Sequence, residues 1–314
     1  MGTLQNGLKA GLRTTWTLGK IIFPITILVT ILQYTPVLPW LIQLVEPFMG
    51  IFGLSGEAAI PLVLGNALNL YAGIAGMLSL DLTVKEVFIL AMMMSFAHNL
   101  FIETGVALKV GVKLWVVLLV RFGLAALSGI VINLVWQGGG EVAKYGMVPS
   151  QVTVPEGWLE IGLLGVQKAS YGVLQLALIV IPLMIFVQFL KDRQYLERFS
   201  EKMTPLTKVI GVQPNASLTF VAGLVIGLAY GAGVMIQAVQ EEGVSKKDAT
   251  LVFIFLVACH AVIEDTLLFI PLGIPVWPLL IIRVITAFVL TIVVAYLWRR
   301  AERQEKKGEP IIDG

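Results

Sequence analysis

The feature that most constrains this chain is a polar motif that occurs twice within otherwise apolar sequence. The first copy begins HNLFIET at position 98 and the second begins HAVIEDT at position 260, an offset of 162. Ionisable residues are expensive inside apolar segments, so their recurrence at a fixed offset indicates an internal duplication. The matched pairs are His98 with His260, Glu103 with Asp265, Thr104 with Thr266, and Arg121 with Arg283.

Composition places this motif in a membrane protein. Hydrophobic residues make up 57% of the chain and charged residues 13%, whereas about a quarter of the residues in soluble domains are charged. Several apolar runs approach the ~20 residues that a helix needs to cross a bilayer, and none alternates as a barrel strand does. We therefore predict an all-α integral membrane protein whose main partner is the lipid bilayer. The net charge of +2 gives no indication of nucleic-acid binding.

The duplication extends beyond the motif and divides the chain. Upstream of the motif the two halves match at an offset of 158, as Gly65 with Gly223 and Gly73 with Gly231. This pattern predicts two repeats joined by a polar linker. The expected segments are an N-terminal amphipathic segment (1–19), a first repeat (20–136), a linker (137–160), a second repeat (161–298) and a basic tail (299–314).

The positions of charged residues predict the path of each repeat. In the first repeat, the apolar segments 20–34, 58–80 and 115–136 are expected to cross the membrane, and 40–53 to lie at its surface. Lys109 returns the chain to water about ten residues after His98, which is too short for another crossing. We expect a re-entrant helical hairpin at 83–109, with His98 at its tip. Three crossings per repeat would turn the second repeat upside down.

Positive residues favour this inversion. If the N-terminus is cytoplasmic, the basic segment Lys191–Lys208 and the basic tail also lie on the cytoplasmic side, as the positive-inside rule requires. Parallel repeats would place Lys191–Lys208 outside. We therefore expect inverted-topology repeats in a cytoplasmic membrane, with both termini in the cytoplasm. The sequence leaves the oligomeric state open, and a homo-oligomer is compatible with it.

Two inverted hairpins whose tips meet near the bilayer midplane would gather one polar site. Arg121 and Arg283 are expected to pair with carboxylates or with a substrate anion, because an unpaired guanidinium at the bilayer centre costs about 2.5–3.5 kcal/mol. The alternative is that these groups only pin the hairpins together. The residues expected around a bound solute are His98, Asn99, Glu103, Thr104, His260, Glu264, Asp265 and Thr266, with Asn66 and Asn69 from the preceding Gly-rich segment.

The ligand chemistry of this site leaves two kinds of cargo open. Imidazole, amide and carboxylate groups can hydrogen-bond a small polar organic solute, whereas His98, Glu103, Cys259, His260 and Asp265 would suit a divalent transition metal. A non-transporting membrane scaffold is a third interpretation. Motifs for phosphate loops, nucleophile elbows and zinc proteases are absent from the sequence, so we expect no enzyme, and no cofactor is indicated.

Two further stretches carry a family resemblance. GNALNLYAGIAGM (65–77) precedes the hairpin sequence AHNLFIET, and GLVIGLAYGAGVM (223–235) precedes CHAVIEDT. In these stretches the chain resembles the nucleoside recognition, or Gate, domain proteins. These bacterial membrane proteins share a module with concentrative nucleoside transporters, the membrane part of the ferrous iron permease and spore maturation membrane proteins. The resemblance implies a bacterial inner-membrane permease with re-entrant hairpins, whose cargo is nucleoside-like or, alternatively, ferrous iron-like.

Overall fold

The computed structural model describes residues 2–144, 155, 157–193, 195–229, 231–241 and 243–308. Regular structure in these residues is helical, apart from an isolated bridge between Thr83 and Val142. Most of the second half of the expected linker, and the end of the basic tail, lie outside the described residues. An all-helical chain is therefore confirmed for the described part.

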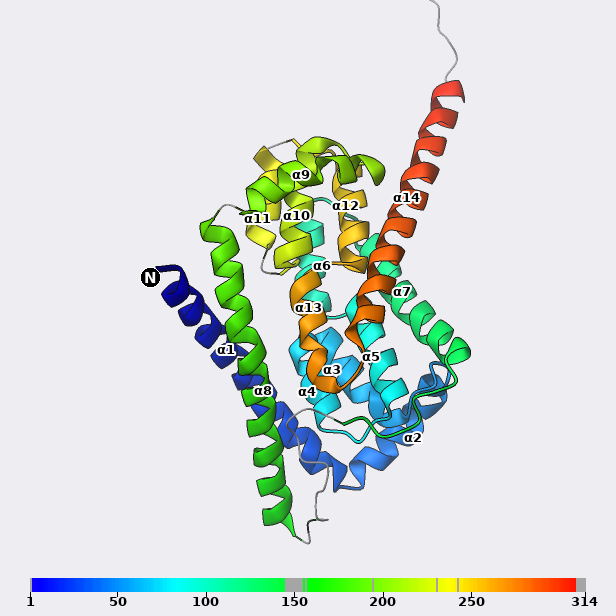
Figure 1. The fold of residues 1–314 in the computed structure, drawn as a ribbon. Helices are drawn as coiled ribbons and strands as arrows, with labels where there is room; N and C mark the ends of the chain where they lie inside the picture. The colour runs from blue at the N-terminus through cyan, green and yellow to red at the C-terminus, as the bar shows by residue number, and fades with distance from the viewer. Residues whose placement is uncertain are drawn as a thin grey trace, which may run out of the picture.

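The helices follow one another in the same order in each half of the chain (Figure 1). The first half contains α1 (Gly2–Gln33), α2 (Val37–Gly50), the 3-10 turn η1 (Gly56–Ala58), α3 (Ala59–Ala67), α4 (Leu70–Leu78), α5 (Val84–Phe96), α6 (Leu100–Lys109) and α7 (Leu114–Val135). The second half contains α8 (Trp158–Asp192), α9 (Tyr195–Val209), η2 (Pro214–Ala216), α10 (Ser217–Ile226), α11 (Ala232–Glu241), α12 (Lys246–Ala258), α13 (Val262–Leu268), η3 (Ile270–Leu272) and α14 (Val276–Gly308).

Four helical stretches in the described residues are long and apolar enough to cross a membrane, which supports an integral membrane protein. Val84–Lys109 and Lys246–Leu268 carry the polar motif, and 83% and 78% of their most apolar windows are buried. In Leu114–Val135 and Val276–Gln304, only 22% and 28% of the corresponding windows are buried. The motif helices are therefore enclosed by protein, while α7 and α14 present apolar side chains outward, where lipid would cover them.

The chain doubles back one element earlier than the sequence suggested. Residues 58–80 were expected to form one spanning helix, but they form α3 and α4, helices of nine residues each. A Cβ on Gly73 would lie 3.0 Å from the Cα of Gly65, so the two helices pack closely and antiparallel. The break occurs at Asn69, whose side chain accepts a hydrogen bond from the amide of Ala72 and caps α4. These nine-residue helices are too short to span a bilayer.

The motif segments run on instead of turning back. α5 and α6 together form one candidate span of 26 residues with a break near His98, and α12 and α13 form another. The prediction of a re-entrant turn at 83–109 is therefore wrong, because the chain continues in one direction through this segment. A short helical hairpin and a broken apolar helix have thus exchanged places relative to the expected order.

The N-terminal segment also differs from the expectation. Residues 1–19 were expected to lie apart as an amphipathic surface segment, but residues 2–19 are continuous with the rest of α1. α1 and α8 lie side by side (Figure 1). A Cβ on Gly7 would lie 2.6 Å from the Cα of Ile185, and one on Gly11 would lie 2.8 Å from that of Ile181. The two glycines are four residues apart, as in close helix pairs of membrane proteins.

Candidate functional site

The site forms where the two motif helices break. Asn99, between α5 and α6, has a φ of +47°, and Ala261, between α12 and α13, has a φ of +43°. Residues other than glycine rarely adopt this left-handed conformation, and such strain often occurs at functional sites. The amide of Asn99 bonds the carbonyl of Gly65 at 2.8 Å, and that of Ala261 bonds Gly223 at 3.2 Å. Helices α3 and α10, each through the carbonyl of its single glycine, thus hold the two breaks in the same way.

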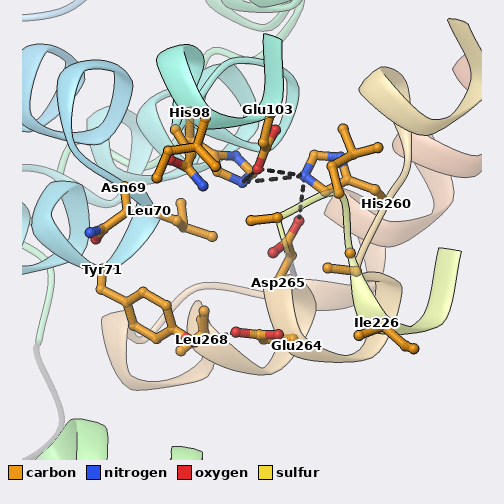
Figure 2. A pocket seen from close by; sticks show the side chains of 16 residues that line it. Asn69, Leu70, Tyr71, His98, Glu103, Ile226, His260, Glu264, Asp265 and Leu268 are labelled. Carbon is orange, nitrogen blue, oxygen red and sulfur yellow. Dashed lines mark hydrogen bonds and ion pairs between the residues drawn. The ribbon is translucent and has the colours of Figure 1, made fainter. Parts of the chain in front are cut away.

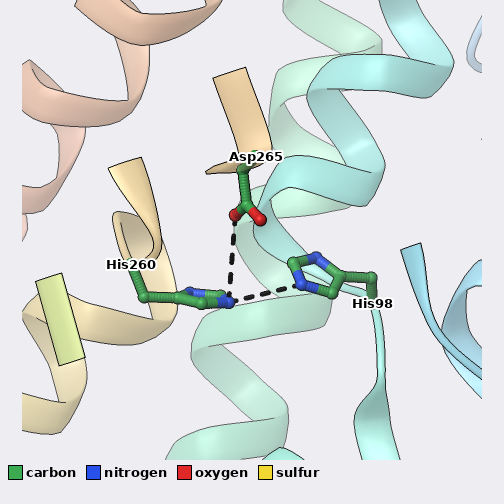
Figure 3. Close-up of side chains that lie close together, drawn as sticks. All are labelled: His98, His260 and Asp265. Carbon is green, nitrogen blue, oxygen red and sulfur yellow. Dashed lines mark hydrogen bonds and ion pairs between the residues drawn. The ribbon is translucent and has the colours of Figure 1, made fainter. Parts of the chain in front are cut away.

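Each break directs a buried histidine toward the other half of the chain. The Nδ1 atom of His98 lies 2.6 Å from the carbonyl oxygen of Met94, and that of His260 lies 2.7 Å from the carbonyl oxygen of Leu256. A carbonyl only accepts, so Nδ1 carries the proton in both rings, and Nε2 of a neutral ring presents a lone pair. The two Nε2 atoms lie 3.3 Å apart (Figure 3).

Two buried ion pairs surround the histidines. Arg121 Nη1 donates to Glu103 Oε2 at 2.6 Å, and Arg283 Nη2 donates to Asp265 Oδ2 at 2.8 Å. Each arginine also donates to the carbonyl of the motif histidine in its own half. The arginine–carboxylate pairs suggested by the motif are therefore present. The two charges of each pair neutralise one another, and the arginines also supply hydrogen-bond donors to carbonyls that the helix breaks leave free.

Glu103 connects the two halves. Its Oε1 atom lies 3.3 Å from Nε2 of His98 and 3.3 Å from Nε2 of His260. Asp265 is slightly more distant, with Oδ2 4.0 Å from Nε2 of His260. The ligand atoms of His98, His260 and Asp265 all lie within 4.8 Å of one another (Figure 3). Imidazole and carboxylate acceptors from both repeats thus converge on one point.

A cavity of about 230 Å³ opens beside this cluster (Figure 2). Tyr71 and Glu264 both line it, and the Tyr71 hydroxyl donates to Glu264 Oε1. The side-chain oxygen of Asn99 is buried with no hydrogen-bond partner in the structure. Helices from both halves line the cavity, and its other polar lining residues are Asn69, His98, Glu103, His260 and Asp265.

Several predicted site residues lie elsewhere. The Asn66 amide donates to the carbonyl of Leu62 within its own helix, and the Thr266 hydroxyl donates to Val262. Thr104 and Cys259 are buried, but neither lines the cavity. Conversely, the sequence prediction missed Tyr71. The available signal was its position two residues after Asn69, itself a predicted site residue.

The fold and the site define an integral membrane protein with a transporter-like, duplicated helical core. The chain belongs to the nucleoside recognition (Gate) family, whose sequence profile matches residues 15–113 and again residues 173–274. Over 294 residues it is 64% identical to the uncharacterized membrane protein YvoD of Bacillus subtilis (strain 168), an alignment that covers 94% of each chain. No solved structure matches it.

Proposed function

We propose that this protein is a permease that moves a small polar solute through the cavity between its two halves. The observation that carries the proposal is that one cavity is lined by both helix breaks, so cargo bound there contacts both repeats at once. Relative rocking of two repeats around such a site is the usual basis of alternating access.

The arrangement of helices supports inverted repeats. In Figure 1, α2 to α5 gather at one end of the molecule and α9 to α12 at the opposite end, with α6 and α13 between them. Consequently α5–α6 and α12–α13 approach the centre from opposite ends. Three crossings per half, by α1, α5–α6 and α7, would produce this inversion. We place the protein in the bacterial cytoplasmic membrane with both termini in the cytoplasm, as the positive charges favour.

The proposed cargo is nucleoside-like in its chemistry. The family profile is described as nucleoside recognition. The cavity offers an unpartnered amide oxygen on Asn99 and a carboxylate on Glu264, both of which accept hydrogen bonds from N–H and O–H groups. Apolar lining residues such as Leu70, Ile226 and Leu268 would contact the faces of a ring.

Uptake into proteoliposomes tests the proposal. Purified protein would be reconstituted and offered a panel of labelled nucleosides and nucleobases. We expect saturable uptake of at least one compound, reduced at least tenfold in Asn99→Ala. Asn66→Ala is the matched control, because that amide bonds within its own helix away from the cavity. If no compound enters and His98→Ala changes only stability, the scaffold interpretation replaces the permease.

A further inference from the structure

We propose that His98, His260 and Glu103 form a binding site for one divalent transition metal ion. The argument begins with three atoms, Nε2 of His98, Nε2 of His260 and Oε1 of Glu103. Each lies 3.3 Å from the other two. Tetrahedral zinc with bonds of about 2.0–2.1 Å separates its ligand atoms by about 3.3 Å. A point about 2.0 Å from all three atoms lies just outside their plane, where a metal ion fits.

The proton positions favour a cation at this point. Because both Nδ1 atoms are bonded to carbonyl oxygens, the two Nε2 atoms are acceptors in the neutral rings. Glu103 Oε1 is an acceptor as well. Three acceptors at 3.3 Å repel one another unless a cation or a shared proton lies among them. The backbone carbonyls of Met94 and Leu256 play the part of the outer partners that orient metal-binding histidines in known sites.

The formal charges also favour a cation. Arg121 and Arg283 balance the carboxylates of Glu103 and Asp265. Glu264 adds a further buried carboxylate, and no basic side chain of the described residues forms an ion pair with it. Its hydrogen-bond donor is the Tyr71 hydroxyl, which is neutral. With these three carboxylates ionised and the two histidines neutral, these groups carry one net negative charge.

The donor set selects the class of metal. Two imidazole nitrogens and a carboxylate oxygen suit zinc, cobalt and other first-row divalent ions, whereas calcium and magnesium prefer oxygen ligands alone. Asp265 Oδ2, 4.0 Å from His260, could complete the shell after a small side-chain movement. Otherwise water or an oxygen-bearing solute could complete the shell from the cavity, which all three ligand residues line (Figure 2).

The proposed metal site borders the cavity that we assign to the cargo, and in this respect alone the inference rests on the proposed function. Binding is measured on purified protein, so it does not require transport. Failure to bind metal would leave solute uptake untouched, and failure of uptake would leave metal binding untouched.

The test titrates Zn(II) into tag-free, metal-stripped, full-length protein by calorimetry. We expect one ion per chain, with affinity reduced more than a hundredfold in His260→Gln and Glu103→Gln. Asp248→Asn is the matched control, because Asp248 is a buried carboxylate in the first turn of α12, where it accepts a hydrogen bond from the Ser245 hydroxyl away from the cavity. It should keep the wild-type affinity. The proposal would be overturned if His260→Gln and Glu103→Gln both kept the wild-type affinity, or if the wild-type protein did not bind Zn(II).

A second measurement does not depend on the variants folding. X-ray absorption by zinc bound to the wild-type protein counts imidazole ligands and distinguishes sulfur from nitrogen and oxygen. We expect two imidazoles and at least one further light ligand at about 2.0–2.1 Å. A sulfur ligand would point to Cys259, and a shell without imidazole would place the ion elsewhere. Either result would overturn the assignment.

Discussion

The hydroxyl of Tyr71 donates a hydrogen bond to the carboxylate of Glu264, and this contact joins the two repeats on one side of the cavity only. At the offsets that relate the halves, Tyr71 corresponds to Ala229 and Glu264 to Ile102. Ala229 and Ile102 also line the cavity, but they offer no polar group. The site is therefore duplicated in its histidines and ion pairs and asymmetric in the groups that would recognise a solute.

Replacing Tyr71 with phenylalanine tests the importance of this contact. The change removes the donor and leaves a buried carboxylate with one hydrogen bond fewer, which should lower the free energy of unfolding by about 1–3 kcal/mol. Denaturation in mixed detergent would measure it. Tyr34→Phe is the control, since Tyr34 lies 38% exposed at the end of α1. Equal stability of the two variants would show that the Tyr71 contact contributes nothing.

The ion pair of Arg121 and Glu103 should be strongly coupled. Arg121→Met alone leaves a buried carboxylate without its partner, and we expect a loss of about 3–5 kcal/mol. The double variant Arg121→Met/Glu103→Gln should recover part of this loss, because neither charge then remains buried. A double-mutant cycle measures the coupling. The same cycle on Arg283 and Asp265 should give a similar value, and additive effects in both cycles would contradict the pairing.

Close packing of α1 on α8 predicts a selective effect of alanine. A Cβ at Gly11 would lie 2.8 Å from the Cα of Ile181, so Gly11→Ala must push the helices apart and should cost about 1–3 kcal/mol. Gly123→Ala in α7 meets nothing within 4 Å and should be neutral or slightly stabilising. Thermal unfolding of the two variants makes the comparison. A similar result for both would mean that α1 and α8 are not packed this closely.

Inverted repeats predict that equivalent ends of the two motif spans emerge on opposite sides of the membrane. Single cysteines at Lys109, which ends α6, and at Pro271, in η3 after α13, would be introduced with Cys259 replaced by serine. An impermeant thiol reagent should label the cysteine at 109 from the cytoplasmic side and the cysteine at 271 from the other side. Labelling of both from one side would contradict the inversion.

The sequence predicted the polar centre better than the path of the helices. The pairs of His98 with His260, Glu103 with Arg121 and Asp265 with Arg283 could be inferred because charged groups in apolar sequence need partners. The hairpin was misplaced because Asn69 in apolar sequence is compatible with a continuous helix as well as with a cap. Only the close approach of glycines in α3 and α4 shows that the chain turns there.

Other errors arose because neighbours in sequence need not be neighbours in space. Cys259 precedes His260, but α12 ends just before it at Ala258, and Cys259 does not line the cavity. Tyr71 has no charge to mark it and becomes a site residue only because the break at Asn69 places it opposite Glu264. Gly7 and Gly11 went unnoticed because Leu4, Leu8 and Leu12, about one helical turn apart, suggested an amphipathic surface segment.

Access to the cavity from both sides of the membrane tests the permease most directly. Ala229→Cys, in a Cys259→Ser background, places a small reactive group on the cavity wall. In oriented vesicles, alternating access predicts that an impermeant reagent labels this cysteine from either side. Val257→Cys, at a position only 1% exposed in α12, should stay unlabelled. Labelling of the cysteine at 229 from one side only, or from neither, would contradict the account.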